Sequence, residues 1–162
     1  MLKLKEIIED LMCDDETSTL LENCTLISAV GFYGDKENLE KWELIFYDLL
    51  NDKAYKIDVD HELNYRIYES ELLDKRFKDI LFDVSSDFID EDEALRVSFD
   101  HYMSHYRNKE IESMFIVLNT LDNLWHLNLL TRYLSVIQIS VDLYSGEVKD
   151  SKEVNLIHVE RE

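Results

Sequence analysis

The sequence predicts an α+β fold of two α-β-β-β repeats, with antiparallel sheets and helices packed on one face. The main observation is a pair of similar hairpin patterns, WELIFYDLLNDKAYKIDVD from Trp42 and WHLNLLTRYLSVIQISVDLYSGEVK from Trp125. Both open with Trp-x-Leu and end a strand on Val-Asp, and the tryptophans lie 83 positions apart (125 minus 42). The second observation is helical spacing of apolar residues before each run of strands, and the third is the short polar turns between strands.

The domain boundary is predicted from the same patterns. We expect a first repeat over residues 1–83 and a second over 84–162. Glycine is scarce and proline is absent, so no segment has the composition of a flexible linker. The two repeats are therefore expected to pack as one compact body.

The first repeat is expected to begin with an amphipathic helix over residues 2–13. Its apolar residues recur at helical spacing: Leu4, Ile7, Ile8, Leu11 and Met12. The acidic residues that follow, 14–16, lie at the unfavourable C-terminal pole of the helix dipole, so the helix should fray there.

The rest of the first repeat alternates in the manner of strands. β-branched and apolar residues predict strands over 25–33, 42–49 and 55–60, and a short one over 65–68. Asn51 and Asp52 supply the turn of the first hairpin. Residues 71–82 then return to helical spacing.

The second repeat is expected to begin with a helix from Asp90 to about Asn108. Asp90 is predicted to be the N-cap, with Glu93 three residues later as in a capping box. The apolar stripe of this helix is expected to comprise Leu95, Phe99, Tyr102, Met103 and Tyr106. Strands are predicted to follow over 111–119, 125–130, 134–144 and 154–159.

A short motif closes the second hairpin pattern: Val141-Asp142-x-x-Ser145-Gly146-Glu147-Val148. With a helix before it and a tryptophan on the second strand, this unit resembles the PepSY module, whose usual ending is close to Val-Asp-Ala-x-Thr-Gly-Glu-Val. The first pattern departs from this ending, because no glycine follows Val59 and Asp60. The resemblance implies a tandem of non-catalytic modules that bind or restrain peptidases outside the cytoplasm.

Charge is the strongest functional signal. The chain has 17 Lys and Arg against 36 Asp and Glu, a net charge of −19. Such a field repels nucleic acid and anionic membranes, so direct binding to either is not expected, and a basic protein partner is favoured. Solubility alone is the alternative explanation of the charge.

The predicted function is therefore a non-catalytic acidic binding protein. It would inhibit or sequester a basic, nucleic-acid-handling protein, as immunity proteins and phage-type inhibitors do. A PepSY-like regulator of peptidases, or an envelope protein-binding module, is the alternative. The predicted partner-binding residues form two acidic clusters: Asp14, Asp15 and Glu16, and Asp87, Asp90, Glu91, Asp92 and Glu93.

The predicted location is the cytoplasm. No stretch reaches the roughly 18 apolar residues of a membrane helix. The first residues form a charged amphipathic segment without the apolar run of a signal peptide.

No catalytic, metal or cofactor site is predicted. His101 and His105 have the spacing of a shared metal site, but HYMSH lacks the glutamate of a zinc peptidase, so we expect surface histidines. Cys13 and Cys24 have no metal-motif spacing, and no nucleophile elbow or glycine-rich loop occurs. An enzyme would instead need a pocket of convergent polar groups, such as these two histidines and His126.

One more surface is predicted. In the first strand of the first hairpin, apolar residues occupy both faces. One of these faces carries Ile45, Tyr47 and Leu49. Most strand aromatics are expected to lie in the core. One such face is nevertheless a candidate for an exposed interaction surface or for a homodimer contact.

Overall fold

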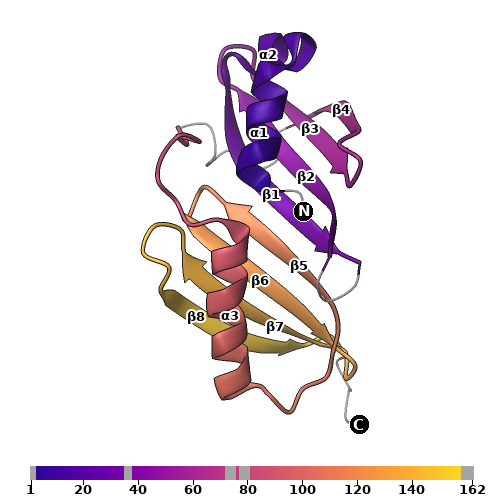
Figure 1. Cartoon of the computed structure of the whole chain (residues 1–162), viewed down its shortest axis with the longest axis vertical. Helices are drawn as coiled ribbons and strands as arrows, with labels where there is room; N and C mark the ends of the chain where they lie inside the picture. The colour runs from indigo at the N-terminus through magenta and orange to yellow at the C-terminus, as the bar shows by residue number, and fades with distance from the viewer. Residues whose placement is uncertain (1–2, 35–37, 72–75, 77–80, 158–162) are drawn as a thin grey trace.

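The computed structural model describes residues 3–34, 38–71, 76 and 81–157 (Figure 1). Eight strands form one antiparallel sheet in the order β4-β3-β2-β1-β5-β6-β7-β8. The strands are β1 (Cys24–Tyr33), β2 (Leu39–Asp48), β3 (Lys53–Asp60), β4 (Tyr65–Ser70), β5 (Ile111–Asn119), β6 (Leu124–Thr131), β7 (Ser135–Asp142) and β8 (Val148–Asn155). The helices of the described part are α1 (Leu4–Cys13), α2 (Asp15–Leu21) and α3 (Glu91–His105).

The predicted arrangement of two α-β-β-β repeats with their own antiparallel sheets was wrong. The fourth strands predicted over 65–68 and 154–159 belong to the sheet as β4 and β8, so the repeat is not α-β-β-β, and β1 pairs with β5 to join all eight strands in one sheet. β8 also begins at Val148, earlier than the predicted strand over 154–159. The alternation of apolar residues missed these features because β8 has no fully buried side chain, and because the β1–β5 pairing joins segments far apart in the chain.

The local elements were predicted more successfully. α1 forms over nearly the expected residues and buries Leu4, Ile7, Ile8 and Leu11. The two predicted hairpins are confirmed as β2–β3 and β6–β7. The helix predicted over 71–82 lies mostly outside the described residues. Among the residues described, no helix is both long enough and apolar enough to cross a membrane.

α1 and α3 lie over the same face of the sheet (Figure 1). The main core lies between these helices and that face. Trp42 of β2 and Trp125 of β6 are fully buried there, with ring centroids 6.4 Å apart. Trp125 Nε1 also donates a hydrogen bond to the carbonyl of Ile89, at 2.9 Å. The tryptophans of the two hairpin patterns therefore meet at the centre of the fold.

The start of α3 follows the prediction, but its buried face does not. The Asp90 carboxylate accepts the Glu93 N–H at 2.9 Å, as expected of an N-cap. The Glu93 carboxylate binds Arg96 instead of completing a capping box. The buried residues of the helix are Glu91, Ala94, Ser98 and Tyr102. The predicted stripe was wrong at Met103, which is 59% exposed, because α3 approaches the sheet through small residues that a hydrophobic pattern does not register.

The helix α2 was not predicted. Asp14, expected where α1 frays, is instead the N-cap of α2 and accepts the Thr17 N–H at 3.0 Å. The acidic residues thus follow the end of α1, as predicted, but they also start α2, where negative charge is favourable.

Candidate functional site

The second predicted acidic cluster lies at the start of α3 and holds the start of α1. Lys3 Nζ lies 3.4 Å from Asp90 Oδ2 and 3.1 Å from Asp92 Oδ2. Glu91 Oε1 accepts the backbone N–H of Leu4 at 3.0 Å. Three of the five predicted partner-binding residues in this cluster are therefore engaged inside the molecule.

The other two residues of this cluster are placed differently. The Glu93 carboxylate lies 2.6 Å from Arg96 Nη2, in an exposed ion pair. Asp87 is exposed on the loop before α3. The cluster therefore mainly fixes the start of α1 to the start of α3, and little of it is available to bind a partner.

Glu91 is unusual because its carboxylate is buried. The residue is only 2% exposed, and its Oε2 has no hydrogen-bond partner among the described residues. Burial raises the pKa of Glu91, and repulsion from Asp90 and Asp92 adds to the shift, while the hydrogen bond from Leu4 opposes it.

The first predicted cluster lies at the other end of α1. The ten residues of this helix span about 15 Å, so the structure does not bring the two clusters together. The pKa of Asp14 is lowered, first by the Thr17 N–H and then by the Tyr65 hydroxyl. Asp15 and Glu16 are exposed on the first turn of α2.

The histidines do not converge on one site. His101 and His105 stack at 4.0 Å on α3, and His101 Nε2 lies 2.9 Å from Ser151 Oγ. His126 alternates on β6 with the buried Trp125, so it faces away from the helices and contacts Ser140 at 2.8 Å. Within the described ranges, no group of three or more metal-ligating side chains is placed to hold an ion.

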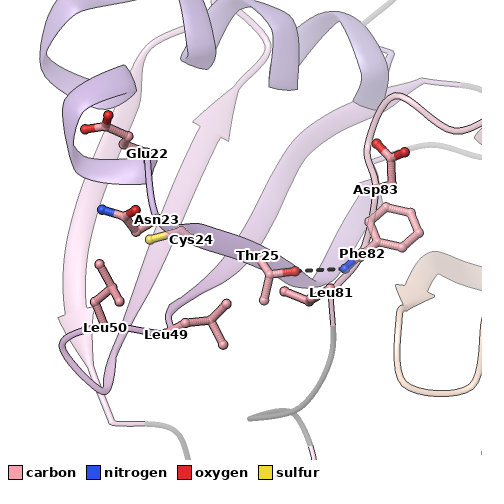
Figure 2. Close-up of a pocket in the computed structure, with 9 residues that line it drawn as sticks. All are labelled: Glu22, Asn23, Cys24, Thr25, Leu49, Leu50, Leu81, Phe82 and Asp83. Atoms are coloured by element: carbon pink, nitrogen blue, oxygen red, sulfur yellow. Dashed lines mark hydrogen bonds between the residues drawn. The ribbon is translucent and has the colours of Figure 1, made fainter.

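A hollow of about 360 Å³ lies where α2 ends, beside the β2–β3 turn (Figure 2). Figure 2 shows residues from three segments around it, the end of α2 with the start of β1, the β2–β3 turn and residues 81–83. The Phe82 N–H donates to Thr25 Oγ1 at 3.0 Å and holds the third segment in place. The lining residues are Glu22, Asn23, Cys24, Thr25, Leu49, Leu50, Leu81, Phe82 and Asp83.

A second hollow, of about 580 Å³, shares Asn23 with the first. It lies between α2 and the neighbouring strands, and its lining residues are Glu16, Thr19, Leu20, Asn23, Asp48, Asn51, Tyr55, Ile67 and Glu69. Together the described linings include five carboxylates, from Glu16, Glu22, Asp48, Glu69 and Asp83, and no Lys, Arg or His. We call these two hollows the acidic pole.

The acidic pole also exposes apolar surface. Leu50 is 74% exposed and Leu81 is 80% exposed. The turn that carries Leu50 is held by Asp48, whose Oδ1 accepts the N–H groups of Leu50 and Asn51 at 2.9 and 3.1 Å. The Asn51 side chain lowers the pKa of Asp48 most, so this carboxylate stays ionised at neutral pH. A preorganised turn therefore holds a leucine in solvent beside carboxylates.

The thiol in the first hollow is not an activated nucleophile. Burial, with a smaller contribution from Asp48, raises the pKa of Cys24 to about 11. Its Sγ donates a weak hydrogen bond to the carbonyl oxygen of Leu20, at 3.5 Å. At neutral pH the group is therefore a protonated thiol, which attacks electrophiles poorly.

Among the residues of this pole, the sequence pointed only to Glu16 and Leu49 as candidates for contact with another protein. The available signal was a Leu-Leu pair directly before the Asn51-Asp52 turn, since such a pair at a turn is exposed unless the fold covers it. Glu22 and Asp83 gave no signal, because they meet the turn only through the tertiary structure.

Comparison with known proteins identifies a fold but no family. No model of a protein family matches the chain, and no curated protein matches it. A crystal structure of a “putative lipoprotein” from Clostridium difficile 630 has a similar fold, with a TM-score of 0.63. At 11% identity the likeness covers 94% of this chain and 93% of the other, so it concerns the fold alone.

Proposed function

We propose that the protein is a non-catalytic binding protein that captures a basic protein partner at the acidic pole. The observation that carries this proposal is that the described linings of two adjoining hollows contain five carboxylates and no cation, next to exposed leucines. One of these carboxylates, that of Glu69, forms an ion pair with Lys53 at 3.1 Å. Lysine and arginine side chains carry long apolar stems and charged ends, so they complement both features. The field of a chain with net charge −19 would also speed the encounter. In this proposal the protein works in the cytoplasm.

The test removes charge from the acidic pole without disturbing its turn. The pole variant combines Glu16→Gln, Glu22→Gln, Glu69→Gln and Asp83→Asn, and leaves Asp48 in place. Proteins of the host lysate are captured at low salt and eluted by a salt series, and the affinity of each basic protein retained is then measured by titration. We expect the pole variant to bind roughly 10- to 100-fold more weakly, because four surface charges contribute about 1.4–2.8 kcal/mol in total.

A matched variant separates the site from the net charge. It combines Glu6→Gln, Glu9→Gln, Glu110→Gln and Glu112→Gln, all exposed and away from the pole. Both variants have a net charge of −15 (−19 plus 4). Equal weakening by both variants, or binding that is indifferent to salt, would contradict capture at the acidic pole.

A second candidate is a protein-binding module of the cell envelope that restrains a peptidase. Two observations favour it, the fold shared with a protein described as a lipoprotein and the resemblance of residues 141–148 to the PepSY ending. In the structure, the Asp142 carboxylate accepts the N–H groups of Tyr144 and Ser145, and Gly146 has φ of +72°. Fractionation of host cells distinguishes the candidates, because this one places the protein in the envelope. Capture of a peptidase that salt does not release would also favour it.

A further inference from the structure

The face of the sheet opposite the helices carries no packed layer among the described residues. Strand residues alternate between the two faces, so the neighbours of the buried Trp42 and Trp125 point away from the helices. At the centre of this open face, Phe32 of β1 stacks on Phe115 of β5, with centroids 6.2 Å apart. Phe115 is 38% exposed, and Val30 and Val117 beside it are half-buried.

Strand registers place three long rungs, of seven or eight residues each, across the open face. From β4 to β8 the middle rung is Arg66, Asp58, Glu43, Val30, Val117, His126, Ser140 and Asp150. From β3 to β8 a flanking rung is Asp60, Lys41, Phe32, Phe115, Asn128, Gln138 and Lys152. From β4 to β7 the other flanking rung is Tyr68, Lys56, Ile45, Ser28, Asn119, Leu124 and Asp142.

The three rungs of the open face are nearly neutral in a strongly acidic chain. Its three rungs hold four basic and five acidic side chains, against 17 and 36 in the whole sequence. Among the described residues, no carboxylate forms an ion pair with Arg66 or Lys152, at the two edges of this face. Elsewhere like charge opposes self-association, but this face offers apolar surface and unpaired cations.

We propose that the open face binds a second copy of the chain. Two such faces stacked about a twofold axis parallel to the strands place β4 over β8, β3 over β7, β2 over β6 and β1 over β5 of the other copy. In the middle rung, Arg66 then lies opposite Asp150 of the second copy, and Val30 lies opposite Val117. In one flanking rung Phe32 lies opposite Phe115.

The remaining rung is complementary under the same operation. Lys56 lies opposite Asp142 of the second copy, Ile45 opposite Leu124, and Ser28 opposite Asn119. Across the three rungs, two pairs of opposite charges and three apolar pairs therefore face each other. The charges of Lys41, Asp58 and Asp60 face uncharged polar side chains. Because the interface is isologous, each of these contacts occurs twice. This assembly does not rest on partner binding at the acidic pole.

Sedimentation velocity of the full chain over a range of concentrations tests the proposal. The parent protein is expected to approach twice its mass of 19.3 kDa. Phe115→Glu places a charge beside the twofold axis and is expected to leave a monomer. Arg66→Glu is expected to raise the dissociation constant of the dimer roughly tenfold, because it replaces two attractions by two repulsions.

A charge swap tests the alignment of the copies. The double variant Arg66→Glu with Asp150→Arg restores opposite charges across the axis and is expected to recover the parent's dissociation constant. Arg107→Glu makes the same change of net charge on an exposed arginine outside the three rungs and is expected to leave the dimer intact. A parent protein that is monomeric at every concentration overturns the proposal, and so does a dimer that resists both Phe115→Glu and Arg66→Glu.

Discussion

Replacing Trp42 by alanine is expected to lower the free energy of unfolding by about 3–5 kcal/mol, because the cavity left by a large buried side chain adds to the lost transfer energy. Trp42 is fully buried and lies against Trp125. A Cβ added to Gly31 would lie 3.1 Å from Trp42 Cη2, so the ring packs directly on the backbone of β1. Urea unfolding followed by circular dichroism measures the change.

Two further variants make this result interpretable. Trp42→Phe keeps an aromatic ring and is expected to lose less stability than alanine. Tyr133→Ala removes a ring that is 70% exposed, and it is expected to change stability by no more than about 0.5 kcal/mol. A Trp42→Ala protein that loses less than about 1 kcal/mol would show that the two tryptophans do not form the centre of the core.

Replacing Glu91 by glutamine is expected to raise stability at neutral pH by roughly 1–2 kcal/mol, because a buried charge costs more than a buried amide. The amide oxygen can still accept the Leu4 N–H that Glu91 Oε1 binds. Since the pKa of Glu91 is raised in the folded state, folding retains a proton that the unfolded chain releases above the ordinary value of 4.5. The contribution of Glu91 to the free energy of unfolding of the parent is therefore lost as pH rises through the raised pKa.

The difference in stability between Glu91→Gln and the parent is the quantity to measure. It should be small near the ordinary pKa of glutamate, grow as pH rises and level off above the raised value. The stability of the parent must be subtracted at each pH, because other carboxylates make the folded state more stable as pH rises. The pKa values of Asp48, Asp83 and Asp142 are lowered by hydrogen bonds, so their contribution is lost as pH falls. A difference that does not vary with pH would mean that Glu91 is not buried as a carboxylate.

Local elements were predictable from the sequence, and their assembly was not. The spacing of apolar residues in α1 and the Asp90 cap of α3 depend on a few adjacent residues, and both were found. Alternation also located the two central hairpins. The continuous sheet depends on pairing between β1 and β5, for which neither strand carries a separate signal.

The candidate site shows the same limit. Net charge predicts a basic partner, but it does not distinguish carboxylates that hold the fold together from those that face solvent. Glu91 was expected on the surface, as charged residues usually are, yet it is buried against α1. Leu50 was not predicted to be part of a binding surface, yet its turn holds it in solvent beside Asp48.

The pairing of β1 with β5 has a consequence for the order of folding. Every other neighbour in the sheet follows directly in the sequence, whereas the β1–β5 register joins residues 81 to 91 positions apart (114 minus 33 and 119 minus 28). Closing so long a loop costs chain entropy before its contacts form. We therefore expect the hairpins on either side to form first, and pulsed hydrogen exchange during refolding should protect the amides between β1 and β5 last. Protection of those amides together with the hairpins would instead indicate a single concerted step.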